Sequence, residues 1–383
     1  MHSKKRTVFI FVGILLSICF WTLDCIAASP IRVGSLLSLS GRGMLAGVPT
    51  KNSIQMAADD LNKAGGINGR PVEVIFYDTE TKEDTSVKMV NRLIKKDGVL
   101  AIVGINTSWE AMVVLPIVEK EQIPTIMDAA TVSIVRPTRK WVFKVPPDDR
   151  IVVGRMLAHM KSKGIQRLAV LTSMDSYGDG GRTEAISQAP SYGINIVLDE
   201  RFTGDETDLT PVINKVKKTD AQATFSQCSK RTPEVVMSNY RQLGIELPLY
   251  MGNSVVMPGS LQAVGAAAEG VLSATFKFQG GKDLADSDPH KKVILDYEAA
   301  YKKRYGTETN QFAAGGYDAF MIMVNALKKA GDNRKKLRDA IEQTKGFVGT
   351  VGTFNYSPDD HNGLSTESVD MYQVVGGAFK LMK

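Results

Sequence analysis

Two small hydroxyl residues, Ser108 and Thr131, follow two successive strand-like segments and are well placed to hold a ligand. Residues 99–103 form a continuous apolar run that ends in a Gly-Ile-Asn-Thr-Ser turn, and a second strand-like segment ends in Ala-Ala-Thr. The carboxyl ends of parallel strands meet at one edge of the sheet, where open α/β folds bind ligands. A helix beginning near Ser108 would also direct unpaired backbone N–H groups at that edge, which suits a carboxylate. The segment therefore predicts a site for a small anionic molecule.

Residues for catalysis are sparse and scattered. The four histidines lie far apart in the sequence: His2, His159, His290 and His361. Cys228 has no nearby histidine, and no metal-ligand spacing or Gly-x-Ser-x-Gly elbow is present. Asp78 and Asp128 lie near strand ends, but neither has a visible catalytic companion. We therefore predict a protein that binds a ligand without transforming it, with no cofactor and no metal.

Residues 1–28 have the features of a secretory signal peptide. Basic residues at positions 4–6 precede an apolar run from Val8 to Trp21, and small residues follow up to Ala28. The run is shorter than the roughly 20 residues that a membrane-spanning helix needs. We expect cleavage near Ala28 and export, with an uncleaved anchor as the alternative.

The composition of the chain argues against two classes of protein, those stabilised by disulfides and those that bind nucleic acid. Cleavage would leave Cys228 as the sole cysteine, so the exported chain would have no internal disulfide and its stability must come from its core. The net charge is +6, of which the signal peptide contributes +2. Basic residues are scattered rather than arranged in a stripe with aromatic residues, so we expect no nucleic-acid partner.

Two series of alternating strand-like and helical segments follow one another. The first runs from Ile31 to about residue 145, and the second begins beyond Pro146 with strands near residues 168–171, 194–198, 223–226 and 249–251. This alternation predicts an α/β fold with two doubly wound lobes. We also expect helices at residues 289–305 and 312–330, and a hairpin at residues 370–381 that turns at Gly376-Gly377.

The chain resembles a known family, the periplasmic solute-binding proteins of ABC transporters of the branched-chain amino-acid (Leu/Ile/Val-binding) type. The matching signatures run in order through the chain: Ile31–Gly34, Leu39–Gly41, Ala57–Arg70, Val74–Asp78, Ile123–Thr125, Ala129–Thr131, Tyr177–Gly178, Phe312 and Tyr317–Asp318. The Asn-Lys-Ala-Gly-Gly-Ile-Asn-Gly-Arg stretch ending at Arg70 is the most specific of them.

The resemblance implies a type I periplasmic binding protein fold, with two α/β lobes joined by a three-crossover hinge. We expect crossovers near Pro146, Ser273 and Gly352–Phe354. Lobe I would comprise residues 31–145 and 276–350, and lobe II residues 146–275 and 351–383. The resemblance further implies a periplasmic monomer whose closed, ligand-bound form is recognised by an ABC permease in the inner membrane, so that ligand shifts the population toward closure.

The resemblance also implies binding residues. The positions matching Ser108, Ala129 and Thr131 hold the ligand's carboxylate through hydroxyl and backbone N–H groups. Tyr177 matches a cleft-lining aromatic residue on lobe II, and Phe312 matches a residue of lobe I that packs on the ligand's side chain. The alternatives are a helix N-cap for Ser108, a strand-end turn residue for Thr131 and core packing for the two aromatic residues.

Two positions depart from the amino-acid-binding pattern. Family members that bind amino acids receive the ligand's ammonium with a Tyr and a Glu on lobe II, and our alignment places Arg231 and Ser254 there. An ammonium buried without a carboxylate partner would be costly. With Trp109 beside the anion site and Arg42 in a loop expected over the cleft, these residues favour a small organic acid, aromatic ones included, over a free amino acid. The alternative for Arg231 is a surface loop residue, and for Trp109 a cap on the sheet edge.

A ligand-sensing receptor module of the same fold is the alternative function. Amide sensors and some receptor ectodomains also resemble this family. No output domain follows the binding region in this sequence, so such a sensor would need a separate signalling partner.

Overall fold

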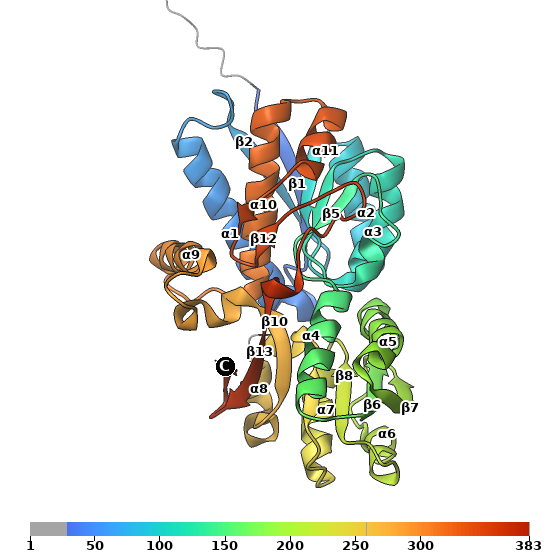
Figure 1. The fold of residues 1–383 in the computed structure, drawn as a ribbon. Coiled ribbons are helices and arrows are strands. Elements are labelled where there is room, and N and C mark those ends of the chain that lie inside the picture. The colour runs from blue at the N-terminus through green and yellow to red at the C-terminus, as the bar shows by residue number, and fades with distance from the viewer. Residues whose placement is uncertain (1–28, 258, 383) are drawn as a thin grey trace, which may run out of the picture.

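Parallel strands and helices alternate through two α/β lobes, shown one above the other in Figure 1. The computed structural model describes residues 29–257 and 259–382. The predicted signal peptide, residues 1–28, therefore lies outside the described residues. Within them, no helix is both long and apolar enough to cross a membrane.

The sheet of lobe I has five strands, all parallel, in the order β2-β1-β3-β4-β5. Its strands are β1 (Ile31–Leu37), β2 (Val72–Asp78), β3 (Ala101–Gly104), β4 (Thr125–Met127) and β5 (Val142–Lys144). The short apolar strands β3, β4 and β5 are buried along their whole length, as strands covered on both faces must be.

The helices of lobe I present apolar residues at helical spacing to this sheet. On α2 (Glu83–Lys95) the residues Val90, Leu93 and Ile94 are buried while lysines and arginine face solvent. The other helices of lobe I are α1 (Met44–Lys63), α3 (Ser108–Lys120), α9 (Pro289–Tyr305), α10 (Gln311–Ala330) and α11 (Arg334–Glu342). The predicted helix at residues 289–305 is confirmed, with Pro at its first turn and left-handed Gly306 at its end.

The sheet of lobe II has seven strands in the order β14-β13-β10-β9-β8-β6-β7. Its strands are β6 (Arg167–Ser173), β7 (Asn195–Phe202), β8 (Ala223–Gln227), β9 (Leu249–Met251), β10 (Leu272–Phe276), β13 (Val369–Val375) and β14 (Ala378–Leu381). The helices are α4 (Asp149–Ser162), α5 (Ser176–Gln188), α6 (Thr210–Ile213), α7 (Thr232–Gln242) and α8 (Ser260–Val264). The predicted hairpin around Gly376-Gly377 is confirmed by the antiparallel pairing of β13 with β14.

The chain passes from one lobe to the other three times. The first passage, between β5 and α4, contains Pro146. The second follows β10, which pairs with β13 as far as Phe276, a few residues beyond Ser273. At Gly352–Phe354, where the third was expected, β12 (Thr353–Phe354) pairs with β11 (Phe347–Val348).

Residues 355–364 instead pack on lobe I before the chain reaches β13. The ring of His361 stacks on Phe143 of β5 at 4.0 Å between centroids, and Tyr356 lies 5.3 Å from the same ring. The backbone N–H of Lys144 donates to the carbonyl of His361 at 3.0 Å. We therefore propose that lobe I extends through Leu364 and that lobe II resumes after it.

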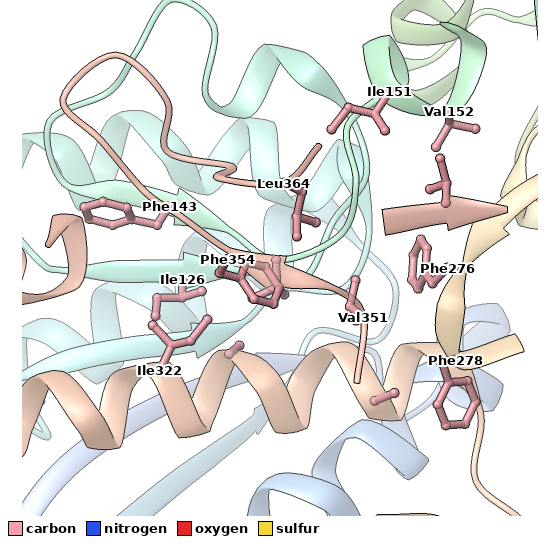
Figure 2. Packing of buried hydrophobic residues seen from close by; sticks show 14 of the residues in the cluster. Ile126, Phe143, Ile151, Val152, Phe276, Phe278, Ile322, Val351, Phe354 and Leu364 are labelled. Carbon is pink, nitrogen blue, oxygen red and sulfur yellow. The ribbon is translucent and has the colours of Figure 1, made fainter. Parts of the chain in front are cut away.

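One apolar cluster is continuous across the boundary between the lobes. Figure 2 shows part of it, with members on lobe I, on α4 and on the segment that leads into lobe II: Ile126, Ile322, Ile151, Val152, Val351, Phe354 and Leu364. The segments that cross between the lobes are buried in this cluster. The cluster therefore holds the two lobes together along one side of the cleft.

Candidate functional site

A cavity of about 110 Å³ lies between the two lobes. An apolar protein cavity of roughly 150 Å³ can hold benzene, so a cavity of this size suits a small organic molecule. Lobe I contributes residues from the ends of β3 and β4 and from the start of α10: Asn106, Thr107, Ser108, Trp109, Asp128, Ala130 and Phe312. Lobe II contributes residues from α5, from the β8–α7 loop and α7, and from the loop after β9: Tyr177, Ser229, Lys230, Pro233, Glu234, Asn253, Ser254 and Met257.

The N-terminus of α3 opens into this cavity without a side-chain cap. Thr107 is the N-cap residue, with extended backbone, but its hydroxyl donates to the carboxylate of Glu110 instead of capping the helix. The N–H groups of Ser108, Trp109 and Glu110 therefore have no side-chain acceptor among the described residues. Ser108 and Trp109 line the cavity, so these N–H groups and the helix dipole form a site for an anion.

The two strand ends meet as the sequence predicts. The backbone N–H of Thr131 donates to Oγ of Ser108 at 3.2 Å, which ties the loop after β4 to the first turn of α3. Thr131 itself is fully buried and lies behind the cavity wall, and Ala129 does too. Side chains alternate along an extended segment, so Asp128 and Ala130 face the cavity while Ala129 and Thr131 face away. Ala129 and Thr131 are therefore not among the residues that line the cavity, and their contact with a ligand stays a prediction.

Tyr177 and Ser254 line the cavity on lobe II, as the resemblance implies. The hydroxyl of Tyr177 donates to Oδ1 of Asn253 at 2.7 Å and accepts from the N–H of Ser254 at 3.1 Å. Burial raises the pKa of Tyr177 far above its ordinary value, so the hydroxyl stays protonated. The Ser254 hydroxyl donates to the carbonyl of Cys228 at 2.7 Å. Both hydroxyl groups already donate their proton within the protein, so neither is free to donate a hydrogen bond to the ligand.

Arg231 does not line the cavity; it is exposed, and its neighbour Lys230 lines the cavity instead. Lys230 has a positive φ of 59°, a left-handed conformation that is uncommon for a residue other than glycine. The Lys230 ammonium donates to Oδ2 of Asp205 at 2.7 Å, so its charge is already paired. The interpretation of Arg231 as a cation facing the ligand is therefore not supported by this geometry.

Arg42 lies at the mouth of the cleft rather than in the inner cavity. Its Nη1 donates to Oδ1 of Asp205 at 3.1 Å, which links lobe I to lobe II. Arg42 borders an outer cavity of about 380 Å³ that shares Trp109 and Lys230 with the inner one. Trp109 therefore lies between the two cavities together with the other residues that they share, and Phe312 of α10, half-buried, lines the inner one.

Replacing Arg231 with alanine should leave ligand affinity within about twofold of the natural protein, because the side chain touches neither the cavity nor the other lobe. Arg42→Ala should weaken binding by about two- to fivefold at low salt and less at high salt. Its partner Asp205 is 62% exposed, and exposed ion pairs contribute about 1 kcal/mol or less. Calorimetric titration of both variants measures this. A large loss for Arg231→Ala alone would place that residue in the site.

Several residues of the cavity wall were not predicted as binding residues, among them Asn106, Asp128 and Glu234. The sequence shows Asp128 only as an isolated carboxylate at a strand end, and Asn106 only as part of a turn. Asp128 is 3% exposed, and its Oδ2 has no hydrogen-bond partner among the described residues. Burial, with the nearby Asp318, raises the pKa of Asp128 well above its ordinary value, whereas Lys144 lowers it. No group of three or more potential metal ligands occurs in the described part of the chain.

Hydrogen bonds join the lobes on either side of the cavity. Gln311, the first residue of α10, donates from Nε2 to the carbonyl of Asn253 at 3.3 Å and accepts from Oγ1 of Thr275 at 2.7 Å. The N–H of Val132 donates to Oδ2 of Asp149, the first residue of α4, at 3.0 Å. The lobes are thus in contact around a partly open cavity whose lobe I wall includes the uncapped N-terminus of α3.

The sequence of this chain is similar to those of known binding proteins. Residues 30–378 match the family model described as periplasmic binding protein. A leucine-, isoleucine-, valine-, threonine- and alanine-binding protein of Pseudomonas aeruginosa is 26% identical over 322 residues, which cover 82% of this chain and 83% of that protein. An amino acid binding protein of the same organism is 23% identical over 72% of both chains.

Solved structures share the fold at similar identity. An extracellular ligand-binding receptor of Rhodopseudomonas palustris HaA2 has a TM-score of 0.86 at 24% identity, covering 92% of this chain and 99% of the receptor. The leucine-binding protein LivK of Thermotoga maritima has a TM-score of 0.82 at 24% identity over 92% and 98% of the two chains. LivJ of Streptococcus pneumoniae, in complex with isoleucine, has a TM-score of 0.80 at 22% identity over 92% and 99%. These structures agree with the two-lobed α/β fold predicted from the sequence.

Proposed function

Because the chain belongs to the Leu/Ile/Val-binding family of periplasmic binding proteins, we propose that it is the extracytoplasmic solute-binding component of an ABC importer. It captures a small carboxylate between its lobes and presents the closed form to a membrane permease. The observation that carries this proposal is the uncapped N-terminus of α3, whose first residues line a cavity between the lobes.

The N-terminus of α3 is the feature of the cavity that favours an anion. The N-terminus of α3 carries a partial positive charge of about half an elementary charge. Among the described residues of the wall, Lys230 is the only lysine, and Asp205 pairs with it. A carboxylate at Ser108 and Trp109 would accept hydrogen bonds from N–H groups that otherwise face the cavity unpaired, which compensates for its loss of water.

The other residues of the cavity wall indicate which kind of carbon skeleton the ligand has. Aromatic and apolar side chains from both lobes surround the cavity, among them Trp109, Tyr177, Phe276 and Phe312. An apolar skeleton, aliphatic or aromatic, would bury its surface against these rings. The relatives named for leucine, isoleucine and valine are consistent with a skeleton of this size.

Contacts from both lobes make closure depend on the ligand. A molecule bound at α3 and packed on Tyr177 stabilises the closed arrangement more than the open one, and only such a difference can shift the equilibrium. The proposal includes a monomer in the periplasm, delivered there by the signal peptide.

A matched pair of ligands tests the proposal. In a thermal-shift screen of acids and amino acids, a ligand at 100 times its Kd should stabilise the protein by about 2.7 kcal/mol. The primary amide of the tightest-binding acid has the same shape but no charge, and we expect it to bind about 30-fold more weakly or worse because the helix N-terminus favours an anion. Equal affinity of acid and amide by calorimetric titration, or no hit among carboxylates, would refute the carboxylate site.

A further inference from the structure

The carboxyl group of Asp149 joins the two lobes directly behind the first turn of α3. Two successive backbone N–H groups in the loop after β4 make the connection on lobe I. That of Thr131 donates to Oγ of Ser108, and that of Val132 donates to Oδ2 of Asp149 at 3.0 Å. On lobe II, Nε2 of Gln227 at the end of β8 donates to Oδ1 of Asp149 at 2.7 Å. Each carboxyl oxygen thus accepts a hydrogen bond from a different lobe.

Gln227 is oriented so that its nitrogen faces Asp149. The same Nε2 donates to the carbonyl of Tyr177 at 2.7 Å, so the NH₂ group lies between two acceptors. With an N–H donor on each oxygen and only 2% of its surface exposed, Asp149 is held as a buried carboxylate. A buried charge is costly when its partners are neutral, so this group is sensitive to any change in its surroundings.

A second acceptor for a proton lies beside the carboxyl. Oγ1 of Thr131 is buried and has no hydrogen-bond partner among the described residues. A Cβ atom at Gly180 of α5 would lie 2.0 Å from Oδ2 of Asp149 and 2.9 Å from Oγ1 of Thr131. The bare helix face at Gly180 therefore lets α5 approach both oxygens, one on each lobe.

The environment of Asp149 depends on closure of the cleft. Val132 is on one lobe and Gln227 on the other, so a rotation that opens the cleft separates these donors and admits water to the carboxyl. Burial is the strongest influence and raises the pKa of Asp149 to about 7, while the hydrogen bonds from Gln227 and Val132 lower it. In an open cleft the burial is relieved, and the pKa falls toward the ordinary value of about 4.

Resting on the proposed function, we propose that Asp149 is a positioning residue for lobe closure and takes up one proton when a ligand draws the lobes together. The proton comes from the solvent and binds Oδ2, which donates it to Oγ1 of Thr131. The closed protein is then neutral at this point, and Oδ2 still accepts from the N–H of Val132. Asp149 acts on the ligand only through the loop that also carries the N–H bound to Ser108.

The other charged and titratable groups around Asp149 do not change the sign of this effect. Lys144 on β5 lowers the pKa of Asp149, and Asp148, the preceding residue, raises it. Nη2 of Arg150, the next residue, lies 3.7 Å from Oδ2 of Asp148. Tyr177 on α5 stays protonated, because burial raises its pKa. The closed form thus binds the proton more tightly than the open form, and ligand affinity rises as the pH falls through the closed-form pKa.

Calorimetric titration of the natural mature protein with leucine and with leucic acid tests the proposal. Both probes keep an ionised carboxylate between pH 5.5 and pH 8. We expect the affinity of a binding probe to rise about 10- to 30-fold from pH 8 to pH 5.5. Titration at pH 6 in buffers of different ionisation enthalpy should show uptake of about one proton for each ligand bound. Binding without proton uptake would overturn the inference.

Asp149→Asn has nearly the same shape and keeps an acceptor for the N–H of Val132, but it cannot titrate. We expect this variant to bind a probe with an affinity that does not change with pH and, at pH 8, at least as tightly as the natural protein. Asp296→Asn, an exposed control on α9, removes the same charge and should keep the pH dependence. An Asp149→Asn variant that is weaker at every pH and still takes up the proton would show a merely structural role.

A measurement without ligand separates this inference from the proposed function. Failure of every carboxylate to bind would refute the proposed function. Small-angle X-ray scattering of the ligand-free protein then tests the inference, and the mean radius of gyration should be smaller at pH 5.5 than at pH 8, with no such change in Asp149→Asn. A radius that is equal at both pH values in the natural protein would overturn the inference. If Asp149→Asn does not fold, proton uptake by the natural protein decides.

Discussion

Ser108→Asp should lower the affinity for a carboxylate ligand by at least about 100-fold. Ser108 is the first residue of α3, and its backbone N–H is one of the groups that we assign to the anion. An aspartate there would place a fixed negative charge in the same enclosed space, and like charges brought together in such an interface cost several kcal/mol. The fold should tolerate the change, because an acidic residue stabilises a helix N-terminus and a carboxylate oxygen can still accept from Thr131. Titration calorimetry with the tightest-binding acid measures the loss.

Asn333→Asp is the matched control for this variant. Asn333 is an exposed N-cap of α11, where its side chain accepts from the N–H of Lys336 at 2.9 Å. An aspartate there adds the same charge at a helix N-terminus distant from the cavity, so affinity should stay unchanged. Binding by Ser108→Asp as tight as that of the control would show that the ligand does not use the N-terminus of α3.

Phe143→Ala should reduce the free energy of unfolding by about 3–5 kcal/mol, the range for removing a large aromatic side chain from a core. Phe143 on β5 is fully buried and contacts both Tyr356 and His361. Its removal therefore leaves a cavity and loosens the segment that we assign to lobe I. Denaturant unfolding followed by circular dichroism should show a lower midpoint with an unchanged slope.

Phe379→Ala provides the comparison for Phe143→Ala. Phe379 lies on the terminal strand β14 and is half-buried, so its loss should cost about 1 kcal/mol. Equal losses for the two variants would contradict the packing of residues 355–364 on lobe I. Faster proteolysis within residues 355–364 in Phe143→Ala alone would support it.

The sequence predicts the secondary structure best where local signals agree. The helix at residues 289–305 begins with Pro and ends at Gly306, and the hairpin turns on adjacent glycines, so both follow from local chemistry. The third crossing could not be located in this way. The segment that begins at Phe354 is the one that we assign to lobe I, because Tyr356 and His361 pack on the ring of Phe143 in β5. Such a tertiary contact leaves no periodic pattern in the sequence.

The candidate site was predictable in outline but not in its individual side chains. The meeting of Ser108 with Thr131 follows from parallel topology alone. Which residues face the cavity depends on how the side chains alternate along the extended segment after β4. It also depends on the backbone at Lys230, where φ is positive. Neither is marked by residue type, so the sequence favoured Thr131 and Arg231 where the structure places Ala130 and Lys230.

A crystal structure of the mature protein with its tightest-binding acid tests the central claim most directly. We predict that the ligand lies in the cavity between the lobes, with its carboxylate oxygens within hydrogen-bond distance of the N–H groups that begin α3 at Ser108–Glu110. A carboxylate that lies on lobe II, or a ligand outside this cavity, would contradict the account.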